Sequence, residues 1–406
     1  MGMDCRTPRI LQVDADAFYV QVARLNDPDR AGRAELLLVG GSAQGRGVVT
    51  SASYAAREFG ARSGMPTAQA LRLCPEAMVV GVPRSACSEK SRAIVKVLEQ
   101  FTPVVEPASI DEMYLDLTGT EELYHGESLA TTARRIRVAV LDQTDISVSI
   151  GGGSNRLVAK LAANRAKPHR TPEADGVVIV PAGEEATFLA GFDLADIPGV
   201  GPRFQERLGR LGMRSVRDAL HYDLPTMQQW FGERTGAWLY HRIRGADRTP
   251  VEPRSQAKSI SRDETFATDL SEEDHLTREL LRLVDRATGD LRKHRWAART
   301  IGVKIRDYDF TTRQKSCTLP APVMSDRSVA AVAKELLARL RAVRRVPARL
   351  LSVSLSKLCE QDEVDQLTLF DLHEEEVTDS ERDRALARAV DEVRAKFGRD
   401  AVGRGL

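Results

Sequence analysis

The sequence contains no long apolar run, and its first residues lack the apolar segment of a secretory signal. A helix that spans a membrane needs about 20 apolar residues, so we expect no membrane partner and a cytoplasmic location. Cysteine and histidine are also scarce, and the five cysteines and seven histidines are dispersed without metal-ligand spacing. We therefore expect reduced, mostly structural thiols and neither a zinc site nor a disulfide framework.

An overall excess of one charge is absent too, because 59 Lys and Arg stand against 58 Asp and Glu. The balance conceals two unequal segments. Residues 254–357 hold 22 basic and 13 acidic residues, whereas residues 361–406 hold 7 and 13. A basic module followed by an acidic tail is typical of nucleic-acid binders with an attached docking segment. An ordinary basic domain remains the alternative.

What the sequence does contain is three carboxylates at the ends of two strand-like stretches. Asp111 and Glu112 follow a turn and open a run of alternating apolar residues, and Asp14 ends a run just before a helical pattern. Because a strand sends neighbouring side chains to opposite faces, the adjacent acids converge only at a turn or strand end. Three such acids can hold divalent metals for phosphoryl chemistry. Solvated acids at strand ends are the alternative.

The first 172 residues of this 406-residue chain alternate between strand and helix patterns, which predicts an α/β domain. Asp16 is placed to cap the first helix, and Gly151–Gly153 are expected to lead from a strand into the last helix. Tyr54 and Arg57 share a face at a helix start, where they suit a triphosphate or form a surface cation–π pair. The expected strands are 9–14, 36–39, 48–53, 111–117 and 146–150, and the expected helices 17–25, 54–60, 85–101, 127–141 and 156–166.

Residues 185–244 are predicted to form short helices, and Ile197–Gly201 resembles the turn of a helix–hairpin–helix. In that motif glycines, here Gly199 and Gly201, let backbone N–H groups approach a DNA phosphate. A purely structural turn is the alternative. Residues 245–255, with two prolines, are predicted to be a linker.

The basic segment has the order β-α-β-β-α-β, a split βαβ sandwich. The pattern predicts strands over 258–266, 298–308, 311–319 and 350–358 and helices over 272–293 and 328–343. Basic residues recur along its strands at alternating spacings, so much of this charge could face one way and suit a duplex backbone. They are Arg299, Lys304, Arg306, Arg313 and Lys315.

Apolar side chains interrupt the acidic tail at Gln366, Leu367, Leu369 and Phe370. Exposed apolar anchors in such a tail are explained by docking into a groove of a partner. Residues 380–397 follow as a final amphipathic helix.

Together these segments resemble the Y-family translesion DNA polymerases, closest to the bacterial DNA polymerase IV type, over essentially the whole chain. The most specific motif is Ser109-Ile110-Asp111-Glu112, and residues 13–19, 53–60 and 154–168 carry the others. Gln366–Phe370 is similar to the pentapeptide by which bacterial polymerases bind the sliding clamp.

The resemblance implies a multidomain α/β right hand with a βαββαβ little finger and a C-terminal tail. The implied parts are a palm (1–17 and 84–172), fingers (18–83), a helical thumb (173–244), a linker (245–255), the little finger (256–358) and a clamp-binding tail (359–406).

The resemblance also implies roles for individual residues. Asp14, Asp111 and Glu112, with the backbone carbonyl of Ala15, would hold two Mg²⁺ ions, one at the primer 3′-hydroxyl and one at the triphosphate. Tyr19 stands where the family has its steric gate, a ring that excludes a 2′-hydroxyl; on local evidence alone it would be a core aromatic. The implied nucleotide contacts are Phe18, Ser51, Tyr54, Arg57 and Lys167.

The implied reaction is template-directed addition of deoxynucleotides to a primer 3′ end by a monomer. Its partners would be primer–template DNA, dNTP and the bacterial sliding clamp. Short fingers rich in Gly, Ala and Ser would enclose the nascent pair loosely, which predicts low-fidelity bypass of lesions. One alternative is a catalytically inactive, polymerase-like scaffold that binds DNA and the clamp. Another is a nucleotidyl cyclase with a related palm, which would leave the DNA-binding segments and the clamp peptide unexplained.

Overall fold

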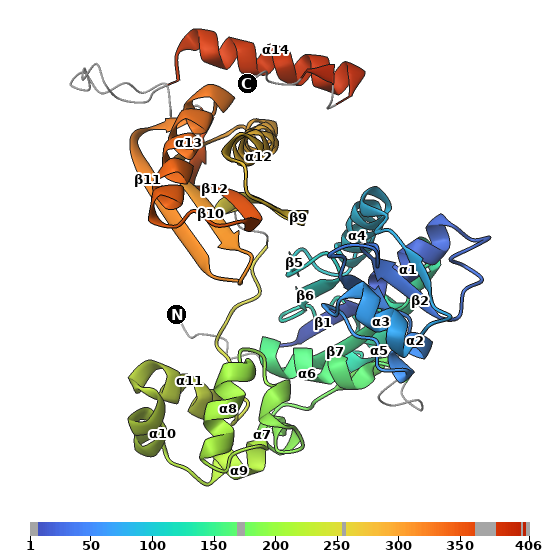
Figure 1. The fold of residues 1–406 in the computed structure, drawn as a ribbon. Coiled ribbons are helices and arrows are strands. Elements are labelled where there is room, and N and C mark those ends of the chain that lie inside the picture. The colour runs from blue at the N-terminus through green and yellow to red at the C-terminus, as the bar shows by residue number, and fades with distance from the viewer. Residues whose placement is uncertain (1–6, 169–174, 254–256, 362–378, 399–400, 403–406) are drawn as a thin grey trace, which may run out of the picture. The chain divides into compact units, whose positions relative to one another are not determined.

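A computed structural model describes residues 7–168, 175–253, 257–361, 379–398 and 401–402 of the chain. It divides into two compact units, Met1–Ser255 and Gln256–Leu406 (Figure 1). Within the described ranges, no helix has both the length and the apolar character needed to cross a membrane. The four cysteines in these ranges are free thiols: Cys74, Cys87, Cys317 and Cys359.

A five-stranded sheet forms the centre of the first unit, in the order β5-β6-β1-β7-β8 (Figure 1). β1 runs antiparallel to both β6 and β7. Leu11, Val13 and Ala15 join a core with α1, α4 and α5. Because side chains alternate along a strand, Gln12 and Asp14 lie on the opposite face, the one covered by α6. The strands are β1 (Ile10–Ala15), β5 (Val105–Pro107), β6 (Glu112–Asp116), β7 (Val148–Gly153) and β8 (Val177–Ile179); the helices are α1 (Phe18–Asn26), α4 (Arg84–Leu98), α5 (Leu129–Thr144) and α6 (Arg156–Ala166).

Strand β7 runs through the glycine triplet, which differs from the expectation that these glycines form a connection. A Cβ on Gly151 would lie 1.9 Å from the backbone nitrogen of Ala163 and 2.2 Å from the carbonyl oxygen of Ala159. Both atoms belong to α6, so the glycine is required by the close approach of this helix to the sheet. The prediction failed because a strand is recognised in the sequence by its apolar side chains. Where the backbone of a helix lies directly against the strand, glycines replace those side chains and the pattern is interrupted.

The rest of the first unit consists of a small sheet and a helical cluster. The sheet has the order β3-β2-β4, and the helical cluster shares its core with four apolar residues of α6. The sheet elements are β2 (Leu37–Gly40), β3 (Val49–Ala52), β4 (Met78–Val80), α2 (Tyr54–Glu58) and α3 (Thr67–Leu73); the cluster contains α7 (Glu185–Leu189), the 3₁₀ helix η1 (Leu194–Asp196), α8 (Pro202–Arg210), α9 (Val216–Leu220), α10 (Leu224–Phe231) and α11 (Glu233–Arg242).

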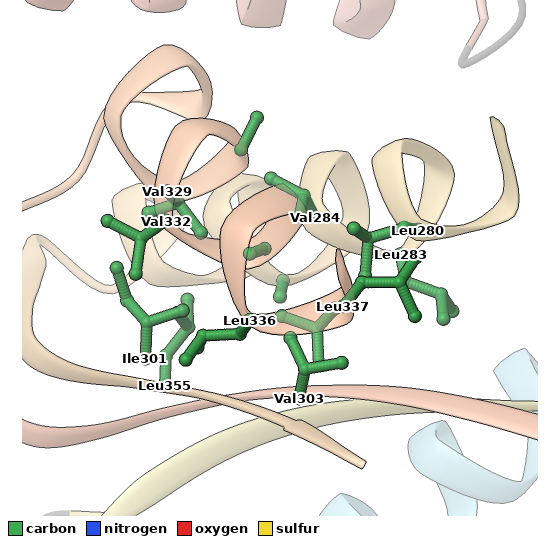
Figure 2. Packing of buried hydrophobic residues seen from close by; sticks show 14 of the residues in the cluster. Leu280, Leu283, Val284, Ile301, Val303, Val329, Val332, Leu336, Leu337 and Leu355 are labelled. Atoms are coloured by element: carbon green, nitrogen blue, oxygen red, sulfur yellow. The ribbon is translucent and has the colours of Figure 1, made fainter. Parts of the chain in front are cut away.

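The second unit has the predicted order β-α-β-β-α-β, and its antiparallel sheet is ordered β11-β10-β12-β9. Helices α12 and α13 cover one face of this sheet. Figure 2 shows Leu283 and Val284 of α12 and Leu336 of α13 above Ile301 and Val303 of the sheet. The elements are β9 (Ser259–Leu270), α12 (Glu273–Lys293), β10 (Trp296–Asp307), β11 (Thr312–Val323), α13 (Asp326–Val343) and β12 (Ala348–Glu360).

The predicted final helix is present as α14 (Glu381–Phe397). It is joined to α12 by Arg292, whose Nε and Nη2 donate to the Asp391 carboxylate at 2.6 and 2.8 Å. Just before the helix, Oδ2 of Asp379 accepts hydrogen bonds from two backbone nitrogens at the start of α13, those of Met324 and Ser325. The helix is therefore an attached part of the second unit.

Candidate catalytic site

Two of the three predicted metal-binding acids face each other across neighbouring strands. Asp14 on β1 is the antiparallel partner of Glu112 on β6. The backbone nitrogen of Ala15 donates to the carbonyl oxygen of Asp111 at 2.9 Å, which fixes the bend before β6 beside the end of β1. The adjacent acids of the motif therefore reach the same region because Asp111 lies at the bend and Glu112 begins the strand.

Asp14 is almost fully buried in this region, with a side chain that is 8% exposed. Burial raises the pKa of its carboxyl, and the negative charges of Glu112 and Asp111 raise it further. The ammonium of Lys167, 2.8 Å away, lowers it, and the balance leaves the pKa at about 6 against an ordinary 3.8. A carboxylate whose charge is this unfavourable in the fold gains free energy from a further cation.

Each acid of the motif has one oxygen held by a hydrogen-bond donor of the protein. Oδ1 of Asp111 accepts from the Ser109 hydroxyl at 2.5 Å, and this hydroxyl also accepts from the backbone nitrogen of Glu112. Oε2 of Glu112 accepts from Nε2 of Gln12 at 3.1 Å and from the ammonium of Lys160. The acids are thus oriented by their own surroundings.

The described residues contain no group of three or more His, Cys, Asp or Glu side chains close enough to qualify as a metal site. The structure instead places lysine ammonium groups on Asp14 and Glu112. The donor set nevertheless fits a hard divalent cation, because it consists of carboxylate oxygens in a partly buried, strongly acidic corner. Which residues would hold the metal therefore stays a prediction.

The predicted steric gate, Tyr19, lies in the first turn of α1 beside these acids. Burial and the nearby charge of Asp111 raise the pKa of its hydroxyl. Its ring meets that of Phe18 edge-on, with centroids 5.6 Å apart. Phe18 is itself only 2% exposed in the core, so its ring is not available for contact with a nucleotide.

Tyr54 and Arg57 form a stacked pair at the start of α2, with the guanidinium carbon 4.8 Å from the ring centroid. Nε of Arg57 donates to the carbonyl of Ala52 at 3.0 Å. Burial raises the pKa of the Tyr54 phenol, and the neighbouring Asp16 carboxylate, which interacts with this hydroxyl, raises it further. Ser51, the remaining predicted contact in this segment, is 6% exposed on β3.

Asp16 does not cap α1, so that prediction was wrong. The N-cap position is Ala17, in the left-handed region at φ 42°, and no side chain caps the helix. The carboxylate of Asp16 is instead bound by the hydroxyls of Ser149 and Ser147 at 2.7 and 3.2 Å. These serines lie on or just before β7, so tertiary partners replaced the local cap.

The two glycines of the predicted helix–hairpin–helix have different environments. Gly199 adopts φ +100°, and a Cβ there would lie 2.7 Å from the ring of Trp238. Gly201 is the N-cap of α8, and a Cβ there would meet nothing within 4 Å. The turn therefore requires one glycine for its backbone conformation, while the other leaves an open approach to the first turn of the helix.

The structure divides the five predicted DNA contacts of the second unit between different surroundings. Lys304 and Arg306 alternate with the buried residues of β10, so they lie on the sheet face away from the helices. Arg313 and Lys315 pair with buried residues of β10, which places them on the helix-covered side. Arg299 lies at a bulge and donates to the carbonyl of Pro320 at 2.8 Å.

Arg313 is also occupied within the unit, because it binds Asp307 at 2.8 Å and the carbonyl of Leu340. The alternating spacing along each strand did not predict which face these residues occupy. The register in which β11 pairs with β10 places the odd-numbered residues of β11, including Arg313 and Lys315, opposite buried residues of β10. The predicted clamp contacts Gln366, Leu367, Leu369 and Phe370 lie outside the described residues.

Three residues that belong to the site were given no role there from the sequence. Gln12 precedes Asp14 by two residues, and Lys160 precedes Lys167 by seven, or about two helical turns. These spacings put each one on the same face as a predicted site residue, which is the signal that could have found them. Asp16 was noticed only as a helix cap.

Comparison with known proteins places these features in a family. The profile of the impB/mucB/samB family matches residues 13–164, that of its C-terminal domain residues 257–369, and that of the DNA polymerase-iota thumb domain residues 195–247. A DNA polymerase IV of Desulfatibacillum aliphaticivorans is 36% identical over 97% of this chain and 95% of its own. One from Halorhodospira halophila is 37% identical over 86% and 95%. A solved Y-family DNA polymerase chimera, Dbh-Dpo4(243-245)-Dbh, superposes with a TM-score of 0.76 at 25% identity, over 87% of this chain and 99% of the chimera.

Proposed function

Because the chain belongs to the DNA polymerase IV group of the Y-family DNA polymerases, we propose that it adds deoxynucleotides to a primer 3′ end opposite a template, including templates that carry lesions. It is a DNA-directed DNA polymerase of the translesion class. The observation that carries the proposal at the level of residues is the facing pair of Asp14 and Glu112, with Asp111 at the adjoining bend.

These three acids would hold divalent metal, two Mg²⁺ ions in our proposal, together with the carbonyl of Ala15. When bound, the metal would lower the pKa of the primer hydroxyl and neutralise charge on the phosphates. The protein would keep the acids in place through the Ser109 hydroxyl and the backbone bond between Ala15 and Asp111. Burial of Asp14 keeps water away from one of the ligands.

The nucleotide would lie between the acids and the start of α2. Lys167 supplies a point charge and Arg57 a planar fork for phosphate oxygens. Phe18 opens α1, a helix whose first turn has no side-chain cap, so its backbone N–H group suits a phosphate as well. Tyr19 would stack against the sugar and exclude a 2′-hydroxyl. Tyr54 and Ser51 complete the proposed set.

The proposal assigns the palm, fingers, thumb, linker, little finger and tail to the residue ranges expected from the sequence. Duplex DNA would contact the backbone at Gly199 and Gly201 and the charged side chains of Lys304 and Arg306. Arg299 and Lys315 remain proposed contacts at the margins of that sheet. Arg313 is the weakest of the five because it lies on the helix-covered side, where the fully buried Asp307 binds it. Gln366–Phe370 would bind the sliding clamp, and the monomer would work in the cytoplasm.

Primer extension on undamaged and lesion-containing templates tests the function. We expect wild-type protein to extend both and Asp111→Ala to extend neither while it still binds primer–template DNA. A wild-type protein that binds DNA without extending it would favour a polymerase-like scaffold. Error rates on undamaged DNA equal to those of a replicative polymerase would contradict the translesion class.

The clamp is tested separately by comparing wild type with the double variant Gln366→Ala and Phe370→Ala. We expect added clamp to stimulate only the wild type, with equal basal extension by both. Stimulation that persists in the variant would remove the pentapeptide from the proposal without affecting the polymerase.

A further inference from the structure

The two oxygens of the Glu112 carboxylate have different surroundings. Oε2 accepts two hydrogen bonds, one from Nε2 of Gln12 at 3.1 Å and one from the ammonium of Lys160. For Oε1, the described residues offer no hydrogen-bond donor. A carboxylate held through one oxygen by two donors has a defined orientation, and its second oxygen remains able to bind a cation.

Gln12 is placed for this contact by the sheet. Its side chain is fully buried on the face of β1 that also carries Asp14. Its amide oxygen has no hydrogen-bond partner among the described residues. A buried glutamine with an unused acceptor costs free energy, so the core of the sheet does not by itself explain this residue. Among the described residues, the side chain of Gln12 makes one hydrogen bond, the one to Glu112.

Lys160 is placed by the packing of α6. The side chain is 26% exposed and that of Glu112 is 29% exposed, so the ion pair lies at the edge of the buried region. Two helical turns later, the same helix ends at Lys167, which pairs with Asp14. The helix therefore delivers one ammonium to each of the two facing acids, and the contact of Gly151 with its backbone fixes its distance from them.

We propose that Gln12 and Lys160 are positioning residues that hold Oε2 of Glu112 and leave Oε1 for the divalent metal at the primer end. The inference rests on the proposed function. Lys160 has a second effect, because its positive charge offsets the acids before a metal binds and therefore competes with the metal. Gln12 is neutral and affects orientation alone.

The two effects separate in measurements on the full-length protein. In Lys160→Met, Mn²⁺ binding to protein without DNA or nucleotide, followed by electron paramagnetic resonance, should tighten about 3-fold or more because the competing charge is gone. The single-turnover rate of nucleotide addition should fall about 10- to 100-fold, as is typical for loss of an outer partner of a metal ligand. The KM for dNTP should change less than about 2-fold, since Lys160 does not contact the nucleotide.

Gln12→Leu should lower the same rate by about 10-fold with Mn²⁺ affinity unchanged within about 2-fold, because no charge is removed. Lys160→Arg keeps the charge and a donor, so it should restore most of the rate. Lys90→Met is the matched control: Lys90 is 29% exposed and pairs with Asp145, away from the acids. It should change neither measurement.

A merely structural role would lower the melting temperature and weaken Mn²⁺ binding together. Unchanged Mn²⁺ affinity in Lys160→Met, or a wild-type rate in both Lys160→Met and Gln12→Leu, would overturn the inference. If wild-type protein extends no primer, the proposed function fails. The Mn²⁺ comparison still decides whether Lys160 competes for Glu112.

Discussion

Both units of the molecule bury carboxylates beside cationic side chains, but they pair them differently. In the second unit Asp307 is fully buried, and both of its oxygens are bonded by Arg313, with Arg344 on Oδ2 at 2.9 Å. In the first unit the facing acids are paired through one oxygen each, and the cations are lysines.

The arginine pairs of Asp307 stabilise the fold, whereas the lysines that pair with the facing acids can be replaced by another cation. A guanidinium offers several donors in a planar fork and stays charged, so it saturates a carboxylate and keeps it. An ammonium is a point charge on a flexible stem, and it can give up its place to a metal ion or a phosphate. We therefore expect replacement of the facing acids in the first unit to alter chemistry and replacement of Asp307 in the second unit to alter stability.

The largest effect is expected for Glu112→Ala. It removes a proposed metal ligand that should act mainly at the primer 3′-hydroxyl, so extension should fall about 1000-fold or more. Binding of dNTP should remain largely intact in Glu112→Ala, whereas Asp111→Ala should weaken both extension and dNTP binding. Single-nucleotide incorporation and a dNTP titration measure the two quantities. The control is Glu89→Ala, because Glu89 is an exposed acid on α4. An active Glu112→Ala would contradict the proposed difference between the acids of the first unit and Asp307 of the second.

Asp307→Ala tests the second unit. It leaves two arginines without their buried partner, and the free energy of unfolding should fall by about 3 kcal/mol. Chemical denaturation measures the loss, and single-nucleotide incorporation on saturating DNA should change little. Asp309→Ala is the comparison, since Asp309 binds Arg344 at the surface and should cost less. An equal decrease in the free energy of unfolding for the two variants would show that the burial of Asp307 does not cause the larger loss of stability.

Gly151→Ala tests whether the close packing of α6 against β7 positions Lys160 and Lys167. The added methyl group would overlap the backbone of α6, so we expect the free energy of unfolding to fall by about 2 kcal/mol and incorporation to fall with it. Gly45→Ala serves as control because a Cβ there has open space. An unchanged free energy of unfolding in Gly151→Ala would mean that α6 can move away from the sheet without loss of stability. The rate of incorporation would then show whether that movement affects the acids.

The smallest effect concerns pH. The pKa of Asp14 is raised from 3.8 to about 6, so the folded protein holds this proton more tightly than the unfolded chain does. The contribution of Asp14 to the free energy of unfolding therefore falls as pH rises from about 4 through about 6. Without divalent cations, Asp14→Asn should be more stable than wild type at pH 8 and nearly equal to it at pH 4. Asp29→Asn, exposed on the surface, should show no such trend.

The sequence was sufficient wherever one local pattern decided the structure. The alternation around Asp111 and Glu112, the order of elements in the second unit and the amphipathic helix α14 were all predicted, and the structure contains them. Their hydrophobic periods are long or their turn residues distinctive, so local information was enough.

The predictions failed where a distant segment decided instead. Asp16 is bound by serines more than 130 residues away, and Gly151 extends a strand because α6 covers it. The face on which Arg313 lies depends on the pairing register of two strands. The contact between Lys160 and Glu112 joins residues 48 positions apart, and no local pattern encodes it.

Helix α6 belongs to two cores at once. Ala159 packs with Ile10 and Tyr114 of the central sheet, whereas Leu157 and Leu161 pack with the helices that follow residue 185. Because one helix contributes to both cores, we expect substitutions that shift the helical cluster to displace the ammonium groups of Lys160 and Lys167 as well.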